Sequence, residues 1–328
     1  MRWGRVAQMG VAWATGSQSV GYAPKQVSIE PTNACNYRCS FCPQSNPAHH
    51  EQVPRGLMKL ADLDMILDKI TAAGAAWNRT ISFTHDGEPL LHPEFPEFIR
   101  KANARGLRPR FSSNGSRLTP DKADLLEAAG YFRASIDFSG SEEIFEKHRG
   151  KTGHWELVRS NIAYLIERSN ANPSVCLEVT EMCGIQAPDD ARTLLDRLRS
   201  VLPEPTSKRV QFNIRVFHNA AGTVQLGHST KKQQYKRCPY PWVSFVIAWN
   251  GDVHACCRDL EGKTRLGNML ETGSLWDIWN GERYRRFREL IANRQPEKVD
   301  ACAGCDLPWS GDPQKWSVKN ILRALRDR

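Results

Sequence analysis

The sequence of 328 residues has no run of eighteen apolar residues, so it offers no transmembrane helix. It also lacks internal repeats, low-complexity segments and any basic run interleaved with aromatic residues, which argues against a repeat architecture and a nucleic-acid groove. The segment from Met1 to Gln18 lacks a clear small-x-small cleavage site and holds Trp3 and Trp13, so it is a poor signal peptide. These absences predict a cytoplasmic protein that binds neither membrane nor nucleic acid.

The composition is that of an ordinary globular protein, with 40% hydrophobic and 25% charged residues and a formal net charge of +9. The length allows one large or two medium domains with a real core. A basic balance suits anionic substrates such as nucleotide sugars, phosphates or carboxylates, or serves solubility alone. The ten cysteines form tight clusters with three left over, which fits metal binding in a reducing compartment better than a disulfide framework.

Three of these cysteines, Cys35, Cys39 and Cys42, fall within eight residues. A [4Fe–4S] cube takes one thiolate per iron, and so short a loop lets three thiols reach three corners of one cube. One iron is then left open to a cofactor or substrate. Zinc is the alternative metal. Zinc knuckles usually come as C-x2-C pairs that complete four ligands, whereas this loop has no fourth cysteine and no close histidine.

Strands and helices alternate from Gln26 onwards. We expect strands at 26–30, 80–84, 108–113, 132–137, 174–180 and 209–217, with helices between them at 60–70, 96–104, 120–130, from 141, at 154–168 and at 189–201. Such alternation predicts a parallel sheet with right-handed crossovers. A closed eight-unit barrel needs about 250 residues and only about 190 are available, so a partial (β/α)6 parallel barrel fits better. The cysteine loop follows the first strand, at the end of such barrels where the chemistry gathers.

The composition changes from about Lys236 to Pro308, where tryptophan is frequent. Residues 245–256 predict a hairpin with a two-residue Asn250-Gly251 turn, and short helices are expected at 274–279 and 284–292. This part also holds a second set of thiols, and four thiols close a cube into a site that passes electrons but binds no substrate at iron. A structural zinc site with four cysteines is the alternative. The cysteines of this set are Cys238, Cys256, Cys257, Cys302 and Cys305.

Together these features resemble the radical S-adenosylmethionine (SAM) enzymes with a C-terminal SPASM or shorter twitch domain. The resemblance is carried by the C-x3-C-x2-C loop with Phe41 before its last cysteine, by Gly87-Glu88-Pro89, by Cys238 followed by Gly251-x4-Cys256, by Gly267-Asn268 and by Cys302-x2-Cys305. It covers about residues 26–308. The expected organisation is an N-terminal extension (1–24), a radical SAM partial barrel (25–220), a small α+β Fe–S domain of the SPASM/twitch type (235–310) and a basic amphipathic C-terminal helix (311–328).

The resemblance implies two iron–sulfur clusters. A SAM-binding [4Fe–4S] cluster would be held by Cys35, Cys39 and Cys42, and one auxiliary [4Fe–4S] cluster by Cys238, Cys256, Cys302 and Cys305. A full SPASM domain with two auxiliary clusters needs more cysteines than this chain has after residue 238. The Gly-x4-Cys spacing favours Cys256 over Cys257, although neighbouring cysteines can exchange roles. Cys176 and Cys183 are expected to be buried packing residues.

The resemblance also implies contacts to SAM, whose amine and carboxylate would chelate the open iron. The Gly87-Glu88-Pro89 turn presents little bulk, and Glu88 or a carbonyl would hold the amine, although an ordinary strand-to-helix turn explains the same residues. The ribose and methionyl groups are expected near Ser113, Asn114 and Asp137, with Glu178 as a further candidate. Phe41 would lie near the adenine.

A reductant of the flavodoxin or ferredoxin type would drive cleavage of SAM to a 5′-deoxyadenosyl radical, which takes a hydrogen atom from a C–H bond. If the substrate radical is oxidised, the auxiliary cluster accepts the electron and an alcohol becomes a ketone. If it is quenched, the outcome is epimerisation, with Cys257 as hydrogen donor or, alternatively, as a passive neighbour. His85 and His254 are candidate bases for the hydroxyl proton, each also explained as a structural histidine.

The substrate class follows from the resemblance and from length. Peptide-modifying members usually carry an extra leader-binding domain, and only 24 residues precede the first strand, whereas compact twitch-type members act on small carbohydrates and aminocyclitols in antibiotic pathways. We therefore expect a sugar, aminocyclitol or nucleoside-linked sugar, contacted by Arg215, His218 and His85, with a peptide substrate as the alternative. Outside enzymes, a zinc-stabilised binding protein would hold zinc rather than iron and show no colour.

Overall fold

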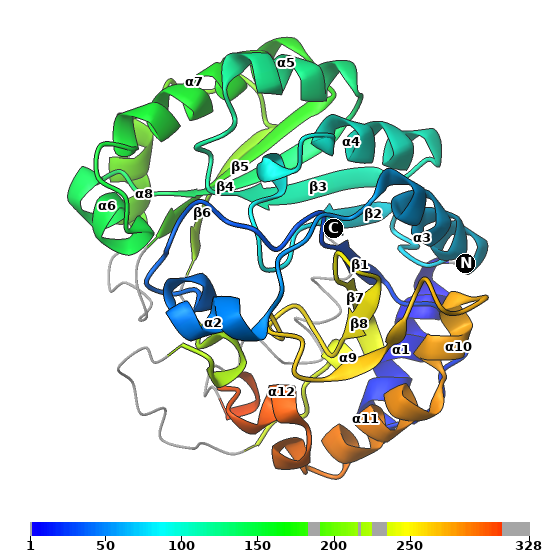
Figure 1. Ribbon diagram of the computed structural model, residues 1–328. Helices are drawn as coiled ribbons and strands as arrows, with labels where there is room; N and C mark the ends of the chain where they lie inside the picture. The colour runs from blue at the N-terminus through cyan, green and yellow to red at the C-terminus, as the bar shows by residue number, and fades with distance from the viewer. Residues whose placement is uncertain (1, 183–190, 216–217, 225–234, 310–328) are drawn as a thin grey trace.

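A single nine-stranded sheet runs through the molecule, in the order β6-β5-β4-β3-β2-β1-β7-β8-β9. The computed structural model describes residues 2–182, 191–215, 218–224 and 235–309 (Figure 1). The first six strands pair in parallel, each with its successor in the chain. They are β1 (Gln26–Ile29), β2 (Thr80–Phe83), β3 (Arg108–Ser113), β4 (Phe132–Phe138), β5 (Val175–Met182) and β6 (Val210–Arg215).

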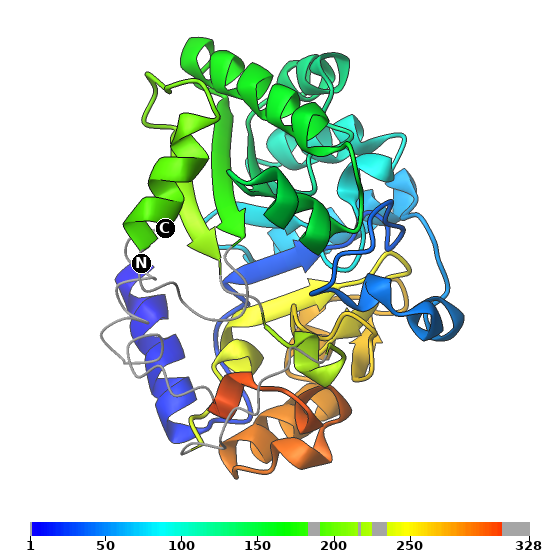
Figure 2. The same cartoon turned by 90° about the vertical axis from the view of Figure 1, so that its left-hand side faces the viewer.

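Helices fill the connections between these strands and cover the outer face of the sheet (Figures 1 and 2). The alternation predicted from the sequence is confirmed, with strand ends displaced by no more than two residues wherever the structure describes them. No helix in the described part of the chain is both long and apolar enough to cross a bilayer. The helices of this half are α3 (Leu60–Ala72), α4 (Phe95–Ala104), α5 (Pro120–Ala128), α6 (Glu142–Arg149), α7 (Trp155–Ala171) and α8 (Ala191–Ser200).

The two faces of the parallel sheet differ in chemistry. On the helix-covered face, Phe83 packs edge-on against Phe98 of α4, and Phe138 packs against Phe145 of α6; all four rings are fully buried. The side chains at the alternate strand positions point to the opposite face of the sheet, here called the polar face. A parallel strand buried on both faces normally reads as a continuous apolar run, so the polar alternation marks a face that meets polar ligands or water. The polar face carries Ser28, Ser82, Arg110, Ser112, Arg133, Ser135, Asp137, Glu178, Thr180 and Asn213.

The sheet does not end with the six-stranded barrel. Strand β7 (Ser244–Ile247) pairs in parallel with β1, and β8 (Asp252–His254) and β9 (Arg265–Asn268) follow it antiparallel. The C-terminal domain, expected as a separate unit, therefore extends the barrel sheet from its first strand. Spacing along the chain does not reveal this pairing, because β1 and β7 lie more than 200 residues apart in sequence.

The hairpin between β7 and β8 differs from the expected two-residue turn. Its loop has three residues, since the N–H of Ala248 donates to Asp252 O at 2.8 Å and the N–H of Gly251 donates to Ala248 O at 2.9 Å. Gly251 has φ of +85°, the left-handed conformation of a G1 bulge after a type I turn. Trp249 belongs to this loop because its N–H donates to Glu30 of the barrel rather than to β8.

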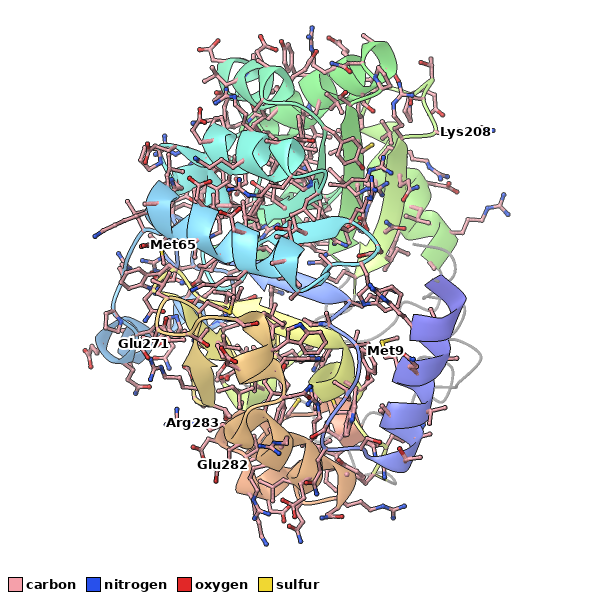
Figure 3. The ribbon with its side chains drawn as sticks, turned by 90° about the vertical axis from the view of Figure 1, so that its right-hand side faces the viewer. Met9, Met65, Lys208, Glu271, Glu282 and Arg283 are labelled. Atoms are coloured by element: carbon pink, nitrogen blue, oxygen red, sulfur yellow. The ribbon has the colours of Figure 1, made fainter. Side chains whose placement is uncertain are left out.

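The N-terminal extension is packed on the C-terminal domain. It forms α1 (Arg2–Thr15), and Met9 lies on the side of α1 that faces the body of the molecule and is only 1% exposed (Figure 3). Arg237 donates to the carbonyl of Trp13, and Trp279 donates to that of Tyr22 at 2.8 Å. The remaining helices are α2 (Pro47–Gln52), which was not predicted, and α9 (Tyr240–Val243), α10 (Leu275–Trp279), α11 (Glu282–Ala292) and α12 (Asp300–Ala303). The helix expected within 311–328 lies outside the described residues.

Candidate functional site

The N-terminal cysteine loop follows β1 and places its three thiols in a buried, mutually coupled group. Burial, the charge of Glu88 and the neighbouring Cys39 raise the pKa of Cys35 to about 12. Burial, Asp86 and Cys39 likewise raise the pKa of Cys42 well above its usual value. Cys35 and Cys42 therefore keep their protons unless a cation displaces them, so the loop is suited to a metal centre that takes thiolates.

Backbone N–H groups two residues downstream point at several of the candidate sulfurs. Tyr37 donates to Cys35 and Gln44 donates to Cys42. In the C-terminal domain the N–H of Arg258 lies 3.4 Å from the Cys256 sulfur. Cys238 and Cys305 receive the same kind of bond from Tyr240 and Leu307. Hydrogen bonds to sulfur stabilise cluster thiolates and tune their potentials, so these residues fit iron–sulfur ligation.

The structure brings the C-terminal thiols together from three segments of the chain. Burial and the neighbouring thiols Cys257, Cys238 and Cys302 raise the pKa of Cys256, and burial, Cys238 and Cys305 raise the pKa of Cys302. Cys257 is exposed, and its sulfur accepts a hydrogen bond from the Tyr240 side chain. It contributes to the raised pKa values of Cys238 and Cys256 but not to that of Cys302. This arrangement favours Cys256 as the fourth member of the quartet.

Glycine is required at Gly87, because a Cβ there would collide with the carbonyl oxygen of Thr32. The turn therefore lies directly against the backbone that leads into the cysteine loop. The N–H of Glu88 donates to Ala34 O at 2.9 Å, which fastens the two segments together, and Pro89 begins a short 3-10 turn. The tight approach supports the interpretation of Gly87-Glu88-Pro89 as a site feature rather than an ordinary turn.

Glu88 is hydrogen-bonded through its carboxylate to residues at the end of β3. Its buried carboxylate accepts hydrogen bonds from Ser113 Oγ at 2.9 Å and from the N–H of Asn114 at 2.7 Å. The Asn114 amide in turn donates to Asn36 in the cysteine loop at 2.9 Å. Three of the residues expected to contact SAM thus hold the ends of β2 and β3 against the loop.

Buried polar atoms without partners gather on the polar face. Among the described residues, Ser135 Oγ, Thr180 Oγ1 and Asp137 Oδ1 have no hydrogen-bond partner. The two hydroxyl residues are only 3% and 2% exposed, and Asp137 and Thr180 are register neighbours on β4 and β5. A buried polar group left unpaired costs about 1–3 kcal/mol, so this group is built for a polar ligand. The ribose, amine and carboxylate of SAM have the matching chemistry.

Ser135 and Thr180 were missed by sequence reasoning. The available signal was the polar alternation within a strand that a parallel sheet should bury on both faces. The candidates that were named nearby are already engaged by protein partners. Asp137 Oδ2 accepts from Arg215 at 3.0 Å, and Glu178 accepts from Asn213 at 2.7 Å.

Arg149 joins the polar face to the cysteine loop and was also missed. It is only 4% exposed, its Nη1 lies 3.4 Å from the Cys39 sulfur, and its Nη2 donates to the carbonyl of Asp137. Its guanidinium carbon stands 5.7 Å from the ring centroid of Phe41. A buried cation in this place favours anionic thiolates and an anionic centre.

The candidate histidines are neutral hydrogen-bonding groups. His85 Nε2 lies 3.0 Å from His254 Nδ1, and burial together with His254 lowers the pKa of His85 to about 3. Its buried Nδ1 has no partner among the described residues. Burial and Arg258 lower the pKa of His218 to about 4. A pKa this low makes each a weak base, so the role of proton acceptor expected for His85 is not supported by its surroundings.

Two family models match this chain. The radical SAM superfamily matches residues 29–201, and the iron–sulfur cluster-binding domain SPASM matches residues 238–306. The fold predicted from the sequence is thereby confirmed. The two matches imply a SAM-binding [4Fe–4S] cluster, an auxiliary iron–sulfur cluster and SAM itself.

Known proteins similar to this chain act on different substrates. Mycofactocin maturase MftC of Mycolicibacterium smegmatis is 26% identical over 313 residues, covering 86% of this chain and 76% of MftC. The structure of BtrN in complex with AdoMet and 2-DOIA has a TM-score of 0.55 at 19% identity, covering 86% of this chain and 92% of BtrN. Streptococcus suis SuiB bound to precursor peptide SuiA has a TM-score of 0.63 at 14% identity, covering 86% and 70%. The two structural likenesses show a shared fold only.

Proposed function

This chain belongs to the radical SAM superfamily, and from that premise we propose that it takes a hydrogen atom from a small hydroxylated molecule, most simply oxidising an alcohol. The observation that carries the SAM-dependent part of the proposal is the group of unpartnered buried oxygens at Ser135, Asp137 and Thr180, which has the chemistry to bind SAM. Arg149 links this group to the cysteine loop, because it contacts both Cys39 and Asp137.

The proposed site residues fall into two cluster-binding groups. Cys35, Cys39 and Cys42 would hold the first cluster, and the glycine at Gly87 keeps the following turn close against the backbone that leads into their loop. When bound, SAM and this cluster supply reductive cleavage to a 5′-deoxyadenosyl radical. Ser135 and Thr180 orient SAM through their hydroxyls. The second centre would be held by Cys238, Cys256, Cys302 and Cys305 and would supply an acceptor for the electron that an alcohol substrate loses, with the hydroxyl proton passing to water.

The proposed substrate is a carbohydrate, an aminocyclitol or a nucleoside-linked sugar. Hydroxyl groups pair naturally with the polar face and with the unpartnered Nδ1 of His85, which we assign as a hydrogen-bonding contact rather than a base. BtrN, whose complex holds AdoMet and 2-DOIA, matches this chain over 92% of its own length. We place the reaction in the cytoplasm, with a flavodoxin- or ferredoxin-type protein as reductant.

A peptide substrate is the second candidate, and the sequence similarity to MftC, a maturase, favours it. Epimerisation is a third outcome within the same chemistry, with Cys257 as hydrogen donor, because its sulfur is hydrogen-bonded by the Tyr240 side chain beside the C-terminal thiols. Cys257→Ala separates the outcomes: SAM cleavage is expected to persist, and loss of product in this variant would assign the donor role to Cys257.

The experiment that tests the substrate class follows deuterium into 5′-deoxyadenosine. The enzyme, reconstituted with iron and sulfide without oxygen, is given SAM, a one-electron reductant and aminocyclitols or sugars deuterated at each carbinol carbon in turn. We expect one labelled position to deliver one deuterium to 5′-deoxyadenosine, read by mass spectrometry. Deuterium transfer from labelled peptides and from none of the small molecules would replace this proposal with the peptide alternative.

A further inference from the structure

A buried histidine–carboxylate pair, His49 and Asp86, lies beside the cysteine loop. His49 comes from α2 and Asp86 from the turn after β2, and His49 Nε2 stands 2.7 Å from Asp86 Oδ2. Both side chains are 1% exposed. The other ring nitrogen of His49 lies 3.5 Å from Glu261 of the C-terminal domain, and Glu261 is paired with Lys263 at 2.9 Å. The pair thus connects the two cluster-bearing halves.

The pair reaches a cluster cysteine through a single side chain. Gln44 Nε2 donates to Asp86 Oδ2 at 2.9 Å and to the carbonyl of Asn33 at 2.9 Å, and Gln44 is 1% exposed. The backbone N–H of this same residue donates to the sulfur of Cys42. The position of that N–H is therefore set by where Asp86 holds the Gln44 amide.

Asp86 is itself held from two sides. Its N–H donates to Glu30 Oε1 at 2.9 Å, and the other oxygen of Glu30 accepts from the N–H of Trp249 in the β7–β8 loop. The turn after β2, the end of β1 and the C-terminal hairpin are thereby fixed to one another. These bonds fix the backbone that carries the Asp86 carboxylate.

The charges of this group favour an imidazolium at His49. Burial disfavours the cation, but the hydrogen bonds and charges of Asp86 and Glu261 outweigh it and raise the pKa of His49 above its usual value. Burying a carboxylate without a partner is costly. His49 removes that cost for Asp86, whose charge contributes to the raised pKa of Cys42.

We propose that His49 and Asp86 are positioning residues for the N-terminal cluster. His49 neutralises the carboxylate beside Cys42, and Asp86 holds Gln44 so that its N–H stays on the Cys42 sulfur. Together they set the reduction potential at which this cluster takes one electron from an external low-potential carrier. Hydrogen bonds to sulfur, net charge and burial are the features by which proteins tune such potentials. The inference rests on the cluster of the proposed function but not on its substrate.

The test is an EPR-monitored redox titration of the reconstituted protein, which resolves both clusters without turnover. His49→Gln keeps a donor for Asp86 but removes the cation, so the carboxylate stands uncompensated near Cys42. We expect the N-terminal cluster of this variant to become harder to reduce, with a more negative midpoint. The auxiliary cluster in the same sample serves as the internal reference and is expected to keep its midpoint.

The double variant His49→Gln with Asp86→Asn distinguishes an effect of charge on the midpoint from a disturbance of the local structure. It removes the cation and the anion together while keeping an amide pair of similar shape, and we expect the midpoint to return towards the wild-type value. Gln44→Met leaves the ion pair intact and removes only the amide link. We expect it to shift the midpoint in the same sense as His49→Gln, and it carries the test if the histidine variant does not fold.

His92 provides the matched control. It is 2% exposed, and its Nε2 lies 2.9 Å from the carbonyl of Met58, with no carboxylate in contact among the described residues. His92→Gln is therefore the same chemical change without the charge, and both midpoints are expected to stay in place. An N-terminal midpoint unchanged in His49→Gln and Gln44→Met, a shift common to both clusters, or a double variant no better than the single one would overturn the proposal.

Discussion

At the scale of single residues, the function of this chain depends on which side-chain atoms the fold leaves without partners. Glu88, Ser113 and Asn114 satisfy one another, and Asp137 is half engaged by Arg215. The hydroxyls of Ser135 and Thr180 are left over. Buried donors without partners are an unusual feature of native proteins, so these atoms are better evidence for a ligand than the satisfied residues beside them.

The unpartnered hydroxyls make a prediction that separates binding from stability. Ser135→Ala or Thr180→Val removes a group that bonds to no described residue in the free protein, so the thermal midpoint is expected to stay unchanged or rise. Binding of SAM is expected to weaken by on the order of 1 kcal/mol, roughly fivefold in Kd. Calorimetric titration with SAM checks the loss. Ser113→Ala, which breaks a bond to Glu88, is the control and should lower the thermal midpoint instead.

The adjacent thiols Cys256 and Cys257 make a second prediction. Cys256→Ala is expected to lose the auxiliary cluster, taking the iron content from roughly eight to roughly four atoms per chain, because Cys256 couples to Cys238 and Cys302. Cys257→Ala is expected to keep the full complement. Iron and sulfide analysis with visible absorption checks both. Reversed results would assign the ligand role to Cys257.

Glu30 makes a prediction about pH. Burial and Asp86 raise its pKa from 4.5 to about 8, so the native state keeps a proton that the unfolded chain loses at lower pH. The free energy of unfolding should therefore fall as pH rises from about 4.5 to about 8, by up to a few kcal/mol. Urea unfolding of the cluster-free protein at about pH 5 and about pH 8, compared with Glu30→Gln, checks this. Equal slopes in the two proteins would show that Glu30 is not the source.

Site residues whose partners lie far away in the sequence were the hardest to predict. The roles of the cysteines, Gly87 and Glu88 at the two clusters stay predictions, but these residues stand out in the sequence because they belong to short local motifs. Arg149, Ser135, Thr180 and the His49–Asp86 pair do not, because their partners lie on other strands and helices. Arg149, for example, reaches Cys39 from the end of α6, 110 residues further along the chain.

At the scale of elements, the periodicity of apolar residues was sufficient to predict the strands and helices of the barrel. Apolar positions at three-four spacing gave α3, and alternation bounded by turns gave the strands, because both depend on neighbours in sequence. The hairpin loop was predicted one residue too short, since a contact between Trp249 and Glu30 of the barrel decides where the ladder starts. The pairing of β7 with β1 has no local signature at all.

Helix α1 makes a prediction at this scale. Met9 is 1% exposed within the core that α1 shares with the C-terminal domain. Met9→Ala should cost about 2–5 kcal/mol, measured by chemical denaturation. The loss should come with faster release of iron from the auxiliary cluster than from the N-terminal one, because α1 packs against the C-terminal half. Val11→Ala, at a position 61% exposed on the same helix, is the control and should change neither.

At the scale of the whole molecule, one continuous sheet carries both thiol sets. The N-terminal loop leaves the sheet after β1, and β7 beside it leads through the hairpin to Cys256. Glu30 and His49 add contacts between the same two halves. The relative placement of the two centres is thus determined by backbone pairing, which supports their use in one reaction rather than in two independent ones.

The most direct test of the account is the formation of 5′-deoxyadenosine by protein purified without oxygen, reconstituted with iron and sulfide, and supplied with SAM and a strong one-electron reductant. The account predicts that the wild-type chain releases 5′-deoxyadenosine and methionine and that Cys39→Ala releases neither. A wild-type protein that holds its full iron complement and yields no 5′-deoxyadenosine would contradict it.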